Sequence, residues 1–366
     1  ASDTDDLTNV NTPVLAGTAE TDSTISITSD INGVVGTAVA FSSVGIWTAV
    51  TTALSDGVHN LSATATDAAG NTSAASSALT VTIDTSAPAA PAGLDLAAGS
   101  DSGSSSTDDI TSDTTPTVSG TADANSTVEL TSSLDGPVGT TSADGSGNWT
   151  ITASTLTDGS HDLTATATDA AGNTGAASSA LAVTIDATAP AAPSTPDLDA
   201  SSDSGVDDDD ITSDDTPSIN GTAEANSTVE LTSSVDGSVG TAIADGSGDW
   251  SITSSALSEG SHDLTATATD AAGNTSATSS ALTVTIDTSS PAAPSTPDLD
   301  AGSDSGSSST DDNTSDDTPT LSGTAEANST IELTSSVDGS VGTTSADGSG
   351  DWSITSSALS EGSHDL

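Results

Sequence analysis

The stretch HDLTATATDAAGN at residues 161–173 decides the fold of this chain. Leu163, Ala165 and Ala167 alternate with polar residues, and a period of two places all three on one face of a β-strand. The stretch ends in Gly172 and Asn173, which tolerate the positive φ of a tight turn. It therefore predicts a half-buried strand that closes in a turn, the building unit of an all-β protein.

The same stretch returns along the chain at a fixed interval. Its histidine and a tryptophan both recur with spacings of 102, 101 and 102 residues. The residues are His59, His161, His262 and His364, and Trp47, Trp149, Trp250 and Trp352. A period near 100 residues indicates one module repeated in tandem, and such arrays serve as spacers or multivalent surfaces more often than as single-site catalysts.

Short proline-rich hinges mark the module boundaries. Pro88, Pro190 and Pro291 open equivalent segments that cannot pair as central strands. We predict modules at residues 1–87, 88–189, 190–290 and 291–366, with the first incomplete at its N-terminal end and the last at its C-terminal end, as in a segment of a longer repeat protein. Because the hinges are short and restricted in φ, we expect an extended linear array with neighbours in a nearly fixed relation.

The second repeat shows how one module is built. Short β-branched runs alternate with Gly, Asp and Asn turns, which is typical of a β-sandwich and not of helices. Seven strands are predicted, at residues 93–97, 115–121, 127–132, 138–143, 148–153, 161–168 and 180–186. The predicted fold class is therefore all-β, with tandem seven-stranded sandwiches.

The net charge of the chain excludes further classes of function. The chain has 54 acidic residues and no lysine or arginine, giving a formal net charge of −54. Such a chain repels phosphate backbones, so nucleic-acid binding is excluded. No ion pair with Lys or Arg is possible, so the carboxylates must be hydrated, screened by salt or neutralised by bound cations. Cysteine is absent, and the longest apolar runs are far shorter than a membrane span.

The acids are clustered at the ends of the modules. If seven strands alternate up and down, the end of the last strand and the loop between the first two strands share one pole. Asp123, Asp144 and Asp169 lie in loops at the opposite pole of module 2, and each junction is expected to bring the first pole of one module against these loops of the next. The candidate ligands are Asp84, Asp101, Asp108, Asp109, Asp169, Asp186, Asp203, Asp207, Asp208, Asp270, Asp287, Asp304, Asp311 and Asp312.

Calcium is the cation that suits these acids. Ca²⁺ takes about six to eight oxygen ligands, which several convergent aspartates and backbone carbonyls can supply. Ligation would remove like-charge repulsion and rigidify the array. Two other interpretations stay open: solvated acids of a protein adapted to high salt, and aspartates chosen for turn geometry. The chain has neither an EF-hand loop nor glycine-rich nonapeptide repeats.

Several repeated strings point to a known family. TATDAAGN at residues 64–71, the run at residues 79–84 followed by Pro88, and Thr115-Pro116 leading to residues 120–122 resemble the bacterial Ig-like modules of giant secreted adhesins and biofilm-associated surface proteins. The resemblance covers essentially the whole chain. It implies Ig-like sandwiches, Ca²⁺ at the junctions with Asp84, Asp186 and Asp287 among its ligands, export often by type I secretion, and the extender of an adhesin.

The sequence gives little support for a catalytic site. Ser160, His161 and Asp162 cannot form a catalytic relay, because neighbours along a strand point to opposite faces. We expect the histidines to begin their strands as exposed polar residues, and the single tryptophan of each module to be a packing anchor.

Three functions remain after this comparison. The first is a Ca²⁺-rigidified stalk at the bacterial cell surface that mediates attachment or biofilm formation. The second is a self-assembling extracellular filament, matrix or surface-layer protein whose modules touch laterally. The third, a carbohydrate-binding array, would require exposed aromatic platforms that one buried Trp in each repeat does not provide. The expected partners are calcium ions and neighbouring modules.

Overall fold

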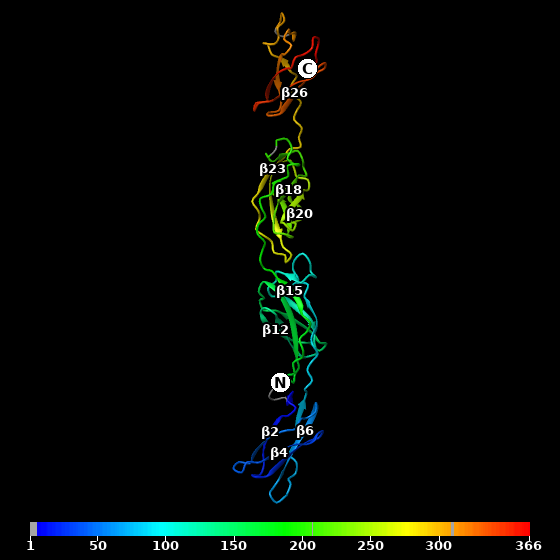
Figure 1. The fold of residues 1–366 in the computed structure, drawn as a ribbon, viewed down its shortest axis with the longest axis vertical. Coiled ribbons are helices and arrows are strands. Elements are labelled where there is room, and N and C mark those ends of the chain that lie inside the picture. The colour runs from blue at the N-terminus through cyan, green and yellow to red at the C-terminus, as the bar shows by residue number, and fades with distance from the viewer. Residues whose placement is uncertain (1–5, 207, 309–310) are drawn as a thin grey trace. The chain divides into compact units, whose positions relative to one another are not determined.

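The computed structural model describes residues 6–206, 208–308 and 311–366. All regular structure in these residues is β-strand (Figure 1). The strands fall into four repeats, which we call modules 1 to 4 and define by strands β1–β7, β8–β15, β16–β23 and β24–β28. The chain divides into two compact units, Ala1–Ser202 with Thr216–Leu257 and His262–Val284, and Asp203–Asp215 with Ser258–Ser261 and Thr285–Leu366.

Module 2 shows the complete sandwich. Its strands are β8 (Ala92–Leu96), β9 (Ile110–Thr111), β10 (Thr117–Thr121), β11 (Thr127–Ser132), β12 (Gly136–Ser142), β13 (Asn148–Thr152), β14 (Gly159–Thr168) and β15 (Leu181–Ile185). One sheet has the order β13-β10-β8 and the other β12-β11-β14-β15-β9. The seven predicted strands are present, and the prediction of tandem all-β sandwiches is confirmed.

The eighth strand, β9, is absent from the sequence prediction. It has two residues, lies inside the predicted first loop and pairs in parallel with β15, with Ile110 opposite Thr184. The loop therefore crosses from one sheet to the other, because β8 is hydrogen-bonded to β10 in the first sheet and β9 to β15 in the second. This crossing holds the loop between residues 97 and 109 against the C-terminal end of the module.

Module 3 repeats this arrangement. Its strands are β16 (Asp197–Leu198), β17 (Ile211–Thr212), β18 (Ser218–Thr222), β19 (Thr228–Ser233), β20 (Gly237–Ile243), β21 (Asp249–Thr253), β22 (Gly260–Thr269) and β23 (Leu282–Ile286). The sheets have the orders β16-β18-β21 and β17-β23-β22-β19-β20.

In the outer modules the described residues form fewer strands. Module 1 has β1 (Leu7–Thr8), β2 (Val14–Thr18), β3 (Thr24–Ser29), β4 (Gly33–Val39), β5 (Ile46–Val50), β6 (Gly57–Thr66) and β7 (Leu79–Ile83). Module 4 has β24 (Asp298–Leu299), β25 (Thr320–Thr324), β26 (Thr330–Ser335), β27 (Gly339–Ser345) and β28 (Asp351–Thr355). Among the described residues of module 1, β2 pairs only with β5, whereas the equivalent strands β10 and β18 each pair on both edges.

A tryptophan packs on a glycine of the neighbouring strand in the three-stranded sheet. Trp149 is 3% exposed, as predicted for a packing anchor, and its indole ring lies on Gly120 of the neighbouring strand. A Cβ added at Gly120 would lie 2.5 Å from Cζ2 of Trp149, so only glycine fits there. Leu130 and Leu163 pack in the same core and are fully buried.

The histidine prediction is wrong. His161 is fully buried within β14, and His59 and His262 are buried in the same way. Nδ1 of His161 lies 2.8 Å from the Ser132 hydroxyl, and Nε2 lies 2.7 Å from the carbonyl oxygen of Thr157. A carbonyl only accepts, so Nε2 donates to it and Nδ1 accepts from the hydroxyl. His59 and His161 thus each join two strands to the loop before their own strand.

Candidate metal centre at the module ends

The loop after the first strand of module 2 holds three aspartates, Asp101, Asp108 and Asp109, and Asp95 lies near them in strand β8. Asp101 is only 6% exposed, and its Oδ1 is buried without a hydrogen-bond donor. Burial, followed by repulsion from Asp108, raises the pKa of Asp101. Burial also raises the pKa of Asp109, with repulsion from Asp101, Asp95 and Asp108 adding to it. These carboxylates are therefore held close together at a cost in electrostatic repulsion.

The backbone explains how the four aspartates are brought together. Asp109 has a φ of 56°, a left-handed conformation that Asp tolerates better than most residues, and its carbonyl accepts from the Thr184 amide at 2.8 Å. Asp108 Oδ1 accepts from the Ile110 amide at 3.2 Å. The first contact binds the end of the loop to strand β15 and the second joins it to the start of β9, while the Asp101 amide donates to the Ala97 carbonyl at the start of the loop.

The arrangement recurs in modules 3 and 4. The Oδ1 atoms of Asp203 and Asp304 are also buried and unpartnered, and Asp304 is 8% exposed. Left-handed aspartates at equivalent positions are Asp6, Asp109, Asp210 and Asp312. A repeated unpartnered carboxylate oxygen indicates a common requirement at this place, because a buried anionic oxygen is costly unless a donor or a cation approaches it.

In module 3 the residues that take the places of Asp108 and Asp109 are Asp209 and Asp210, which follow the predicted ligands Asp207 and Asp208 in the sequence. The Asp210 carbonyl accepts from Thr285, and Asp209 Oδ1 accepts from Ile211, as their counterparts do in module 2. Asp208 instead donates its amide to Asp203 Oδ2 at 2.7 Å, and Asp207 lies outside the described residues. The loop is one residue shorter in module 3, which moves the acidic run relative to strand β17.

The ends of the last strands contact the next module through their backbone. Asn173 Nδ2 donates to the Asp84 carbonyl at 2.8 Å, and Asn274 Nδ2 donates to the Asp186 carbonyl at 2.7 Å. The carboxylates of Asp84, Asp186 and Asp287 are used locally, because each accepts from the amide two residues later. The same junction geometry thus occurs twice, between modules 1 and 2 and between modules 2 and 3.

Asp169 and Asp270 hold those asparagines in position. Oδ1 of Asp169 accepts from the Asn173 amide, and Oδ2 accepts from Nδ2, both at 2.8 Å. Burial acts to raise the pKa of Asp169, but the hydrogen bonds from Asn173 outweigh it, so the pKa is lowered. Asp270 bonds Asn274 in the same way and is 8% exposed. The structure therefore gives these two acids a definite role in orienting a junction residue.

Further contacts join the acidic loop to the next module. Ser102 Oγ donates to the Ala272 carbonyl at 3.3 Å, and the Ser104 amide donates to the Ala271 carbonyl at 3.2 Å. At the first junction, an open pocket of about 290 Å³ is lined by Asp84, Asp123 and Asp169 together with the hinge at Pro88. Of the loops predicted to meet the C-terminal pole, these contacts involve the loop before the next module's last strand, between modules 1 and 2 and between modules 2 and 3.

The acidic loops offer the type of ligand that a cation needs, but the described side chains do not converge into a complete set of ligands. Carboxylate and carbonyl oxygens are the ligands that Ca²⁺ prefers, and Asp101, Asp203 and Asp304 each offer a buried oxygen without a partner. Among the described residues, however, no group of three or more His, Asp or Glu side chains is close enough to hold a metal ion. The fourteen predicted ligands therefore stay a prediction.

Three residues that contribute to the junctions or to the acidic cluster were not predicted from the sequence. Asn173 and Asn274 carry the junction hydrogen bonds, and Asp95 adds to the charge of the module 2 cluster. The recurring Asp and Asn four residues apart in DAAGN was a usable signal, since an Asx side chain often bonds the backbone near it. Asp95 gave no comparable signal, because the sequence does not show that a loop folds back on strand β8.

Sandwiches with a three-stranded and a five-stranded sheet, joined by such ends, define a tandem Ig-like protein. Residues 1–85, 88–187, 189–288 and 291–366 each match the family described as the bacterial Ig-like domain, and the chain belongs to this family. The family points to a non-enzymatic structural protein. No curated protein matches the chain.

Several solved structures are similar. A Ca²⁺-stabilized adhesin with which an Antarctic bacterium binds ice is 26% identical over 94% of this chain and 85% of its own, with a TM-score of 0.36. A 1.5-MDa bacterial ice-binding adhesin is 25% identical over 76% and 92%, with a TM-score of 0.31. A domain of a biofilm-associated protein is 16% identical over 73% and 57%, with a TM-score of 0.21.

No helix in the described part of the chain is long and apolar enough to cross a membrane.

Proposed function

We propose that this chain is part of the extender of a bacterial cell-surface adhesin, and that Ca²⁺ bound at the module ends stiffens it. The observation that carries this proposal is the repeated junction: an asparagine oriented by an aspartate bonds the carbonyl that ends the preceding module. A protein that must hold successive modules in a constant relation needs such a contact at each boundary. The family membership supports a structural and extracellular role, and export to the cell surface is part of the proposal.

The carboxylates of the acidic loop are the proposed ligands. Asp101, Asp108 and Asp109, with Asp95, would hold the ion in module 2, and Asp203 with Asp209 and Asp210 would do so in module 3. Bound Ca²⁺ would supply positive charge that cancels the repulsion within each cluster. Because the loop also bonds the Ala271 and Ala272 carbonyls of the next module, ordering the loop would restrain the junction.

Calcium binding is tested by titration calorimetry on the intact chain, paired with thermal unfolding in EDTA and in millimolar CaCl₂. We expect saturable binding and a higher unfolding temperature with Ca²⁺. The triple variant Asp101→Asn, Asp203→Asn, Asp304→Asn should lose most of both effects. The matched control is the triple variant Asp162→Asn, Asp263→Asn, Asp365→Asn, which removes the same number of charges from exposed positions. Equal loss in both variants would show that Ca²⁺ acts only by screening charge.

Lateral self-assembly is a second candidate, favoured by one feature of module 1. Val14 and Val50 are paired on the outer face of β2 and β5 and are 67% and 63% exposed, and Ile46, at the other end of β5 on the same face, is 45% exposed. Module 2 has Thr117, Thr152 and Asn148 at these positions. Sedimentation of the intact chain over a hundredfold concentration range distinguishes the two: a constant monomer supports the extender, and concentration-dependent growth supports assembly.

A further inference from the structure

The chain contains two Asn-Gly pairs, Asn32-Gly33 in module 1 and Asn220-Gly221 in module 3. Asparagine is thermally labile, and a following glycine favours its deamidation, because no side chain hinders attack by the glycine nitrogen on the side-chain amide. The two pairs have the same local chemistry, but the fold gives them different surroundings. The effect of structure on this reaction can therefore be compared within one molecule.

Asn32 and Gly33 lie in the turn between β3 and β4. Both residues are exposed, Gly33 has a φ of 72°, and a Cβ added at Gly33 would meet no atom within 4 Å. Gly33 pairs with Ser29 at the end of the β3–β4 ladder, and the end of a ladder opens more readily than its middle. Space is thus available around the Gly33 nitrogen for ring closure with the neighbouring side chain.

The side chain of Asn32 is arranged for attack at its carbonyl carbon. Oδ1 accepts two long hydrogen bonds, from the Ser55 amide and from the Ser55 hydroxyl, both at 3.4 Å. When the Gly33 nitrogen attacks Cγ, negative charge develops on Oδ1, and donors that point at this oxygen stabilise that charge. Among the described residues Nδ2 of Asn32 makes no hydrogen bond, so the nitrogen that leaves as ammonia is not held in place.

Asn220 is held in the middle of a sheet. It lies in β18, which pairs with β16 on one side of it and with β21 on the other. Its Nδ2 donates to Asp199 Oδ2 at 2.7 Å, which retains the amide nitrogen and places a negative charge beside a group that must itself become negative. A Cβ added at Gly221 would lie 2.5 Å from Cζ2 of Trp250, so the indole ring occupies the space beside Gly221.

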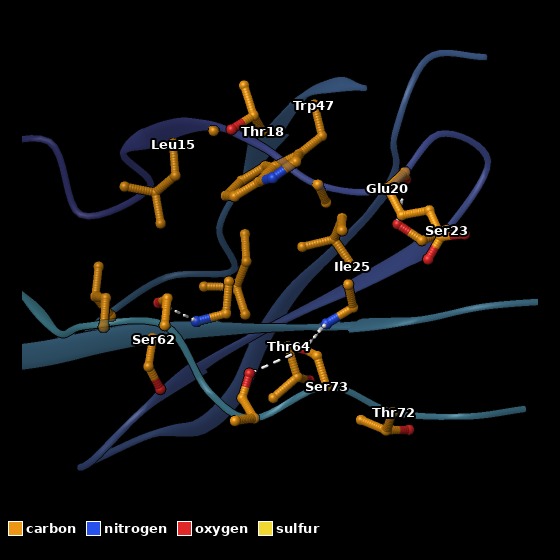
Figure 2. A pocket seen from close by; sticks show the side chains of 18 of the residues that line it. Leu15, Thr18, Glu20, Ser23, Ile25, Trp47, Ser62, Thr64, Thr72 and Ser73 are labelled. Carbon is orange, nitrogen blue, oxygen red and sulfur yellow. Dashed lines mark hydrogen bonds between the residues drawn. The ribbon is translucent and has the colours of Figure 1, made fainter. Parts of the chain in front are cut away.

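The exposure of the Asn32 turn is a property that the modules share. The turn at residues 29–33 does not line the open pocket of module 1, which has a volume of about 910 Å³ and which Figure 2 shows with Leu15 on one side and Ser73 on the other. Ile31 in this turn is 57% exposed, and its counterpart Leu134 in module 2 is 58% exposed. The turn of a module with both of its sheets complete is therefore equally open to water.

From these observations we infer that Asn32 is a site of spontaneous deamidation, with water as the only co-reactant. The Gly33 nitrogen, after losing its proton, forms a bond to Cγ of Asn32. The bond from Cγ to Nδ2 breaks, and Nδ2 leaves as ammonia with a proton in exchange. Water then opens the resulting succinimide: breaking the new bond to Cγ leaves aspartate, and breaking the bond to the main-chain carbonyl carbon leaves isoaspartate.

The aspartate product is the residue that the other modules already have at this place. Its counterparts are Asp135, Asp236 and Asp338, whose Oδ2 atoms lie 3.6, 3.3 and 3.3 Å from Nδ1 of the histidine in the same module. Deamidation gives His59 the same acidic neighbour. Isoaspartate, in contrast, adds a methylene to the main chain of the turn.

The test is peptide mapping by mass spectrometry. The intact chain is incubated at neutral pH, and samples taken at intervals are digested with pepsin. Asn32 should gain the mass of a deamidation at least tenfold faster than Asn220. In concentrated urea, where both are unfolded Asn-Gly pairs, the two rates should agree within twofold. The variant Asn32→Asp should show no further mass change in the peptide that contains this position.

Equal rates at Asn32 and Asn220 in the folded chain would overturn the inference, as would the absence of reaction at Asn32. A difference that persists in urea would also overturn it, because the fold would then not be its cause. Thermal unfolding of Asn32→Asp tests the product: its unfolding temperature should equal or exceed that of the parent chain, and a lower one would show that the turn does not accommodate aspartate.

Discussion

Asn173 of module 2 donates a hydrogen bond to the end of module 1. Replacing it with alanine, beside a matched control, distinguishes the effect of this bond between modules from the effect of a bond inside one module. Nδ2 of Asn173 makes two hydrogen bonds at 2.8 Å, one to Asp169 Oδ2 and one to the Asp84 carbonyl. The module 1 counterpart, Asn71, bonds Asp67 Oδ2 at 2.8 Å in the same way, and no junction bond to it is present among the described residues. Asn71→Ala is therefore a matched control that removes the internal bond alone.

The difference between the two variants is the contribution of one hydrogen bond between modules. A neutral hydrogen bond contributes about 1 kcal/mol net. Its loss should lower the ratio of closed to open junctions about fivefold, since RT is about 0.6 kcal/mol. Asn71→Ala should leave that ratio unchanged, although both variants lose a bond to a carboxylate and become less stable by a similar amount.

Distance measurement between two spin labels resolves this difference. The chain has no cysteine, so Thr48→Cys and Thr150→Cys, at exposed positions of β5 and β13, give a uniquely labelled pair across the first junction. Asn173→Ala should broaden the distance distribution, and Asn71→Ala should reproduce the parent distribution. Identical distributions for Asn173→Ala and Asn71→Ala would refute the argument that this bond restrains the junction.

Three further predictions concern the core, the histidines and the acidic loop. Gly120→Ala should destabilise module 2 by about 1–3 kcal/mol, because its Cβ would overlap the Trp149 ring, whereas Gly145→Ala, with open space around it, should be nearly neutral in thermal unfolding. His161→Phe should cost about 2–4 kcal/mol in denaturant unfolding, because the Ser132 hydroxyl and the Thr157 carbonyl lose their buried partner; a cost below about 0.5 kcal/mol would contradict this. Calcium affinity measured by calorimetry should fall as the pH is lowered. The pKa of Asp101 and that of Asp109 are raised, so these carboxyls take up protons at a higher pH than an ordinary aspartate does. Those protons compete with Ca²⁺ for the same oxygens. An affinity independent of pH between 7 and about 4.5 would exclude these two residues as ligands.

Period-two alternation was sufficient to predict the sandwich and most of its core. Leu163, Ala165 and Ala167 are all 0% exposed, as the stretch at residues 161–173 indicates. The same alternation also places His161 on the inward face, two residues before Leu163. The exposed histidine was predicted because the side chain is polar. Its two buried hydrogen bonds come from residues 29 and four positions away, which no local pattern reveals.

The candidate site was predictable in part. The sequence shows where the acidic residues are, but it does not show which of them the fold brings together. The clustering of Asp101, Asp108 and Asp109 follows from the loop that carries them, but the exact set depends on strand β9. In module 3 the two-residue strand at Ile211 shifts the equivalent pair to Asp209 and Asp210. A two-residue strand depends on its pairing with β23 and has too little sequence to give a periodic signal. Aligning the repeats on Ile110 and Ile211 would have found the shift.

Small-angle X-ray scattering of the intact chain tests the central claim most directly. The profile is recorded in EDTA and in millimolar CaCl₂ at constant ionic strength, for the parent chain and for the triple variant Asp101→Asn, Asp203→Asn, Asp304→Asn. If Ca²⁺ stiffens the junctions, the parent chain changes from a flexible to a rod-like profile and the variant does not. An unchanged parent profile, or the same change in the variant, would contradict a calcium-stiffened extender.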